Sequence, residues 1–299
     1  MSWLLAAILS YFLFAVVALG DKYILRGIIP SPKIYAFYVG ILGILILFLA
    51  PFVFFFPAPW VIVTAISAGI FHILGIFAYF TGLKIFDASR VVSAIGGLAP
   101  IFTFGLIFIF TGGETLSLLG ITAFFLLILG TIIVTWQGKG SLSFKSLKIS
   151  ALASLLFALY FLLAKLTYSN TTFINGFIWT RVGAFLAAAA FLLFPEVRSQ
   201  VFGKKEAFRP KTLVIFLPVQ AAGACGFLLQ NWAFSLAGIT YVAVISALGG
   251  IQYVFLFILA VILSLKFPQI IKEETSGKIL FQKITAILLI GAGLVILSF

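Results

Sequence analysis

Charged side chains, and acidic ones above all, are scarce in this sequence. Only 9% of its 299 residues are charged, 64% are hydrophobic, and the mean hydropathy is +1.29. Because soluble proteins carry about 25% charged residues, a soluble fold is excluded. The single cysteine, Cys225, rules out an internal disulfide and a cysteine-rich metal site. One histidine and seven acids leave little material for hydrolysis, so we expect no catalytic residues, no metal and no cofactor.

What the sequence does contain is long apolar runs. A bilayer core about 30 Å thick needs roughly 20 apolar residues in a helix. Continuous runs of that length do not alternate as the strands of a membrane barrel must. We therefore predict an all-α integral membrane protein with ten transmembrane helices. The predicted spans are 2–20, 34–56, 60–83, 88–111, 116–136, 150–168, 173–194, 212–236, 240–265 and 280–298.

The net charge of +12 reflects where the basic residues lie. Of the 19 Lys and Arg residues, 17 fall in the loops after the first, third, fifth, seventh and ninth runs. Such loops face the cytoplasm by the positive-inside rule. This predicts a multi-pass protein of the cytoplasmic, or inner, cell membrane with both termini outside. Because the charge is explained by orientation, we expect no nucleic acid as a partner.

Short motifs recur along the chain. Leu13-Phe14-Ala15 returns as Leu156-Phe157-Ala158 at an offset of 143, and Ser93–Gly97 returns as Ser246–Gly250 at an offset of 153. The two halves, 1–140 and 147–299, are therefore predicted to be five-helix repeats. Five is an odd number, so the second copy enters the membrane inverted. Inverted repeats are the recurring architecture of secondary transporters.

The motifs also carry a family resemblance. The segment SAIGGLAP at 93–100, the Gly113-Glu114 turn, Gly120 and Gly130 resemble the EamA family of the drug/metabolite transporter superfamily. The segment WTRVGAFLAAAA at 179–190 is similar to the arginine-bearing second span of the family's repeat. The resemblance implies ten spans and the transport of amino acids, nucleosides, sugars or other small metabolites. Family members are often described with both termini in the cytoplasm, whereas the loop charges here predict the opposite.

Arg181 is the main candidate for binding a substrate. It stands about eight residues into its span, or roughly 12 Å along the helix. An ionisable group at that depth is costly and functional by default. A guanidinium there binds a carboxylate or phosphate in two parallel hydrogen bonds. The alternative interpretation is that Arg181 snorkels to the interface or bonds to backbone carbonyl groups.

Other polar groups lie inside the predicted spans. His72 and Tyr79 are seven residues apart on one helical face, and the offset of 153 places Cys225 and Trp232 at equivalent positions. His72 either shuttles a proton or is bonded to a neighbour. The remaining candidates bind the solute or join helices. The full set of candidate substrate-binding residues is Arg181, His72, Tyr79, Gln230, Asn231, Trp232, Gln252 and Tyr253. The pairs Gly96-Gly97 and Gly249-Gly250 are predicted to allow close helix contact.

These features favour a secondary transporter, an exporter of small polar metabolites such as amino acids, that works by alternating access. No acid lies deep within a span, so the solute is expected to be neutral, zwitterionic or anionic. With its halves fused, the chain is sufficient as a monomer in the lipid bilayer. Two alternatives stay open, an integral membrane enzyme acting on lipid-linked substrates and a non-transporting membrane scaffold. The sequence offers the enzyme neither a His cluster nor an Asp pair.

Overall fold

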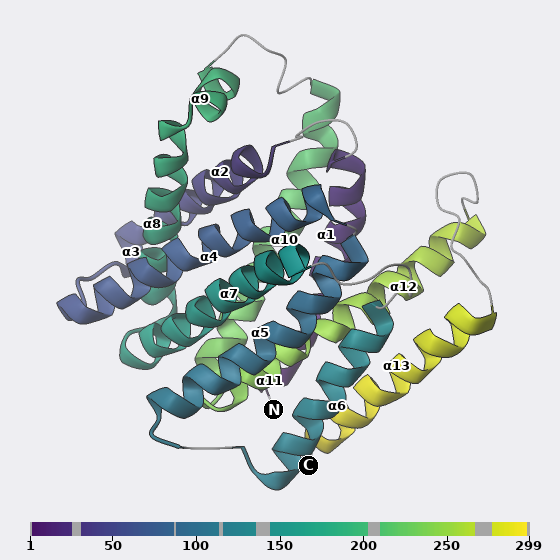
Figure 1. The fold of residues 1–299 in the computed structure, drawn as a ribbon. Helices are drawn as coiled ribbons and strands as arrows, with labels where there is room; N and C mark the ends of the chain where they lie inside the picture. The colour runs from purple at the N-terminus through teal and green to yellow at the C-terminus, as the bar shows by residue number, and fades with distance from the viewer. Residues whose placement is uncertain are drawn as a thin grey trace.

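The computed structural model describes residues 2–25, 31–86, 88–113, 116–135, 144–202, 210–266 and 277–297, and over these ranges it is all-α (Figure 1). The helices of the first half are α1 Ser2–Leu25, α2 Pro32–Leu42, the 3-10 helix η1 Gly43–Leu49, α3 Ala50–Val53, α4 Pro59–Ile85, α5 Ala88–Phe110 and α6 Leu118–Thr135. The helices of the second half are α7 Phe144–Asn170, α8 Phe173–Ala190, the 3-10 helix η2 Phe191–Leu193, α9 Pro195–Phe202, α10 Pro210–Leu236, α11 Tyr241–Ala247, α12 Gly249–Lys266 and α13 Gly277–Leu297.

Helices occupy all ten of the apolar ranges, but three of those ranges are interrupted, and in 173–194 the interruption is the short 3-10 helix η2 at its end. In the range 34–56 the α-helix gives way to η1. Proline at position 51 has no N–H and its ring clashes with the carbonyl four residues earlier, so the chain tightens before it. The bond from the N–H of Ala50 to the carbonyl of Leu47 shows that tightening.

A further interruption divides the range 240–265 into α11 and α12 at Leu248. Two glycines follow the break, and glycine weakens a helix interior. The hydroxyl oxygen of Thr131, in α6, lies 3.4 Å from the carbonyl oxygen of Ala247 at this point. The same hydroxyl donates to the carbonyl of Leu127 in its own helix over 2.7 Å, so α6 packs against the break through Thr131.

The packing joins helices that are far apart in sequence. α1 packs on α10 and α12, α4 packs on α7 and α8, α5 packs on α7, and α6 packs on α13. The main hydrophobic core runs through α1, α6, α7, α10, α11 and α12, and a second core joins α2, α4 and α8 to α9. The first residues of α1 and the last of α13 lie at the same end of the bundle (Figure 1).

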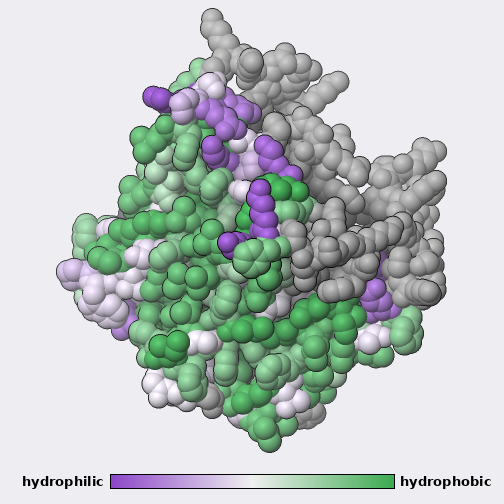
Figure 2. Space-filling view, viewed as in Figure 1, coloured by the Kyte–Doolittle hydropathy of each residue, from purple (hydrophilic) through white to green (hydrophobic). Residues whose placement is uncertain are grey.

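Large apolar side chains also cover the outside of the molecule. Phe52, Leu118 and Leu193 are each at least 80% exposed. Hydrophobic residues dominate the face in Figure 2, and hydrophilic ones gather toward its upper part, near α9. Among the described residues, three helices are long and apolar enough to cross a membrane, Pro59–Ile85, Phe144–Asn170 and Phe173–Leu193. An exposed apolar surface of this kind marks a membrane or interaction face.

Glycines allow the closest approaches between helices. A Cβ on Gly69 of α4 would lie 2.0 Å from the carbonyl oxygen of Thr180, and a Cβ on Gly183 of α8 would lie 2.1 Å from that of Ile66. No side chain fits between these two backbones. The close contact predicted for the two glycine pairs is also observed, because Gly96 and Gly250 would both meet the side chain of Thr131.

Candidate functional site

Arg181 lies in α8 and is buried, with 5% of its surface exposed. Its guanidinium carbon lies 4.2 Å from the ring centre of Phe227 and 5.3 Å from that of Phe177. Aromatic faces attract a cation but cannot accept its hydrogen bonds as oxygen does. Nε and Nη2 of Arg181 are buried and have no hydrogen-bond partner among the described residues. A buried cation is therefore held in place with two of its donor nitrogens unused.

The first turn of η1 lies against the same side chain. A Cβ on Gly43 would sit 3.3 Å from Cδ of Arg181 and 3.5 Å from Nη1. The irregular helix that follows α2 thus begins where the guanidinium lies. Non-helical backbone within a bundle is tolerated where it is buried in protein or lines a cavity.

Two phenols of α7 and one amide of α10 form a hydrogen-bonded group. The hydroxyls of Tyr160 and Tyr168 both donate to Oδ1 of Asn231, over 2.8 and 2.7 Å. Nδ2 of Asn231 donates to the carbonyl of Phe227, one turn earlier in its own helix. The ring centre of Tyr160 lies 5.9 Å from that of Phe227, the ring that the guanidinium also faces. Because each hydroxyl has already given its proton to Asn231, each phenol oxygen can offer a further ligand only its lone pairs.

His72 brings α4 to the same place. Its ring centre lies 4.8 Å from that of Tyr160 and 4.6 Å from that of Phe227. It is 6% exposed, and its Nδ1 is buried with no partner among the described residues. We call the set His72, Tyr160, Tyr168, Arg181 and Asn231 the arginine cluster. Four of its polar atoms are joined by hydrogen bonds, three more have no partner among the described residues, and the set contains no acid.

A second, uncharged polar group lies next to the arginine cluster. Nε2 of Gln230 donates to the hydroxyl of Tyr11 over 3.3 Å, and that hydroxyl donates to the carbonyl of Ile245 over 2.7 Å. The two groups adjoin along α10, because Gln230 and Asn231 are consecutive residues. Gln230 therefore belongs to the uncharged group, and its neighbour Asn231 belongs to the arginine cluster.

The remaining sequence candidates make no hydrogen bond to the arginine cluster among the described residues. Nε2 of Gln252 donates to the carbonyl of Phe14 over 3.4 Å and so joins α12 to α1. Tyr253 follows Gln252 in α12, and Tyr79 packs edge-on against Phe80 in α4. Trp232 is 45% exposed, and no contact with the arginine cluster is found for it among the described residues. Cys225, its predicted companion on the helical face, is exposed as well.

Tyr160 and Tyr168 were not among the sequence candidates. Tyrosine usually lies at the membrane interface, where its hydroxyl reaches water. Tyr160 instead falls in the middle of the range 150–168. Its place inside an apolar run was the signal that could have identified it as a candidate. Phe177 and Phe227 carried no signal, because 36 phenylalanines are spread over the chain.

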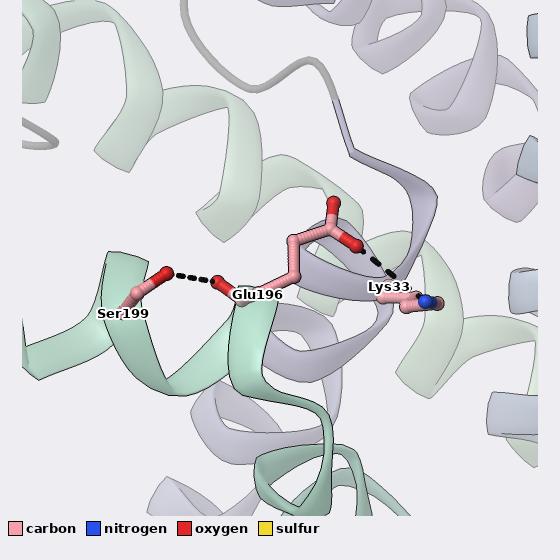
Figure 3. Close-up of polar contacts among 3 residues, drawn as sticks. All are labelled: Lys33, Glu196 and Ser199. Carbon is pink, nitrogen blue, oxygen red and sulfur yellow. Dashed lines mark hydrogen bonds and ion pairs between the residues drawn. The ribbon is translucent and has the colours of Figure 1, made fainter.

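An ion pair lies outside the bundle, at the end of α8. Nζ of Lys33 is 3.4 Å from Oε2 of Glu196 in α9 and 4.4 Å from the ring centre of Phe194 (Figure 3). It is the one salt bridge among the described residues. A hydrogen bond from Ser31, followed by the bond and charge of Lys33, lowers the pKa of Glu196. This contact fastens the start of α2 to α9.

Comparison with known proteins identifies the fold of the chain but neither its family nor its function. No family model matches the sequence, and no curated protein matches it. A crystal structure described only as that of a protein matches 99% of this chain and 96% of its own, with a TM-score of 0.69 and 19% sequence identity. The chain therefore shares the fold of that structure. No cluster of metal-binding side chains occurs in the described part of the chain.

Proposed function

We propose that this protein is a secondary transporter of the EamA type, which moves small polar metabolites bearing an anionic group across the cytoplasmic membrane by alternating access. The observation that carries the proposal is Arg181, a buried guanidinium with two unused donor nitrogens. A charge inside a membrane protein that has no protein counter-ion is functional by default. A solute that supplies the counter-ion completes the site.

The helix pairs support the proposed duplication. In the proposed repeat, α1 corresponds to α7 and α4 corresponds to α10. The pair α1–α10 therefore corresponds to the pair α7–α4. Both pairs pack closely. The last helices of the two halves, α6 and α13, pack on each other, as two equivalents beside a pseudo-two-fold axis would.

An inequality between the halves supports alternating access. The glycines of α4 and α8 bring those two helices into backbone contact. In the proposed repeat, α4 corresponds to α10 and α8 corresponds to α2. The helices α10 and α2 form no comparable contact in the described part of the chain. A carrier built from inverted repeats has one such contact closed while its counterpart is open, and it exchanges them during the cycle.

In this proposal four residues of the arginine cluster have a role. Arg181 holds the anionic group of the solute through paired N–H donors. Asn231 fixes the two phenols, and the rings of Phe177 and Phe227 keep the guanidinium in place. Asn231, Tyr160 and Tyr168 are positioning residues in this scheme.

The test is solute uptake by the purified protein in liposomes. Radiolabelled organic acids, amino acids, nucleosides and sugars are each supplied over a range of concentrations. We expect saturable uptake of at least one anion-bearing class, lowered about tenfold or more by Arg181→Gln because the paired bonds are lost. The matched control is Arg198→Gln, at an exposed arginine of α9, which leaves uptake unchanged.

Uptake that never saturates, or that equals that of empty liposomes for every class, contradicts the proposal. Covalent conversion of a supplied compound would instead favour the membrane enzyme.

A further inference from the structure

We infer that the arginine cluster selects a monoanion, a solute with one carboxylate and no ammonium group, over the zwitterionic amino acid of the same skeleton. This inference rests on the proposed function and names the class of its solute.

The free edge of the guanidinium fits one carboxylate. Nε and Nη2 lie on the same edge of an arginine side chain, and both are unpartnered here. Their two N–H groups point in parallel, which matches the two oxygens of a carboxylate. Nη1, on the other side, lies beside Gly43 instead. The side chain therefore has one bidentate edge, Nε with Nη2, that has no partner among the described residues.

Nothing comparable is available for an ammonium group. Among residues with described side chains the one acid is Glu196, which is bonded to Lys33 outside the bundle. In the sequence, every acid lies at or beyond the end of an apolar run. The aromatic faces of Phe177 and Phe227 could bind a cation, but the guanidinium already occupies them. Two positive charges would compete for the same rings.

The balance of charge then decides between solutes. A monoanion on Arg181 makes the buried site neutral. A zwitterion leaves it with a net charge of +1 and adds an ammonium group that has lost its water. A dianion leaves a net charge of −1. Burying an uncompensated charge is strongly unfavourable, so the neutral combination binds best.

A hydroxy acid also fits the phenols better than an amino acid does. The oxygens of Tyr160 and Tyr168 can accept but not donate, because their protons are bonded to Asn231. A solute hydroxyl donates one hydrogen bond to such an acceptor without bringing a charge. The cluster therefore offers a partner for a neutral hydroxyl next to the carboxylate.

The experiment compares matched pairs of solutes on the full-length purified protein. The pairs are lactate with alanine and 2-hydroxyisocaproate with leucine, and succinate is the dianion. Dissociation constants are measured from the rise of melting temperature with solute concentration. We expect at least one hydroxy acid to bind about tenfold or more tightly than its amino acid, and more tightly than succinate.

Three variants connect the preference to the site. Arg181→Gln is expected to abolish the hydroxy acid shift, and Arg198→Gln to retain it. Arg181→Lys keeps the charge and lowers the risk of misfolding. It should bind the hydroxy acid more weakly than the wild type and still prefer it to the amino acid.

An amino acid that binds as tightly as its hydroxy acid, or more tightly, overturns this inference while leaving an Arg181-dependent transporter in place. The same holds if succinate binds best. If no solute shifts the melting temperature and none shows saturable uptake, the proposed function fails together with the inference.

Discussion

Two buried cations in this bundle are satisfied differently. Lys165 donates from Nζ to the carbonyl oxygen of Ser235 over 3.2 Å, which joins α7 to α10. Arg181 has aromatic faces around it, and its Nε and Nη2 have no acceptor among the described residues. Burial alone therefore does not mark a binding group, because Lys165 is as buried and has a structural role. What distinguishes Arg181 is its unused donor edge.

Glu196 provides a test at the residue scale that lies outside the bundle. Its pKa is lowered first by the hydrogen bond from Ser31 and then by Lys33. A lowered folded-state pKa means that the contact stabilises the fold above the ordinary carboxyl pKa of about 4.3, and that this stabilisation is lost as the pH falls through the folded value. We expect a 13C NMR titration to place Glu196 below that ordinary value.

Variants of Ser31 and Lys33 test which of these two residues lowers the pKa of Glu196 more. Ser31→Ala should raise the pKa of Glu196 more than Lys33→Met does, because an exposed ion pair is screened by water. If Lys33→Met has the larger effect, the hydrogen bond from Ser31 is not the main cause of the lowered pKa. If Glu196 titrates at its ordinary value in the wild type, neither residue bonds to it as described.

At the scale of single elements, helix positions could be read from the sequence and helix interruptions could not. Run length alone locates an apolar helix, because every backbone group in lipid must be bonded within its own segment. The 3-10 segment Gly43–Leu49 is as apolar as its neighbours, so composition did not reveal it. It depends on Pro51 and on Arg181 lying alongside, which is tertiary information.

The same division applies to the candidate site. Arg181 and His72 stand out in an apolar sequence because each carries a costly group. Their partners Tyr160 and Phe227 come from α7 and α10, and only packing brings those helices together. The equivalence drawn between Tyr79 and Trp232 assumed that both faces of the repeat point inward. Trp232 is nearly half exposed in this structure.

The seam between α4 and α8 gives a test at the element scale. Gly183→Ala would place its Cβ 2.1 Å from the carbonyl oxygen of Ile66, so the helices must separate. Overpacking of this kind costs about 1–3 kcal/mol. We expect a lower melting temperature for the purified protein.

The matched control for that test is Gly291→Ala in α13, where an added Cβ meets nothing within 4 Å. Removing a helical glycine there should be neutral or stabilise the protein by about 0.5–1 kcal/mol. Equal melting temperatures for the two variants would show that α4 and α8 are not in backbone contact.

For the whole molecule, the orientation in the membrane is the largest inference still based on sequence alone. The ends of α1 and α13 lie on one side of the bundle, which is compatible with any even number of crossings (Figure 1). The loop charges add the direction. They predict that both termini and the turn between α5 and α6 face outward, and that the segment containing α9 faces the cytoplasm.

Labelling of single cysteines in a Cys225→Ser background tests the predicted orientation. Ser117→Cys lies just before α6 and Ser199→Cys lies in α9, and both positions are exposed and carry no charge that would alter the orientation signal. A membrane-impermeant maleimide should label Ser117→Cys in intact cells and Ser199→Cys only after the cells are permeabilised. The reverse pattern would place both termini in the cytoplasm, as described for the EamA family. Labelling of both from the same side would rule out the predicted arrangement of spans, because an odd number of crossings separates the two positions in it.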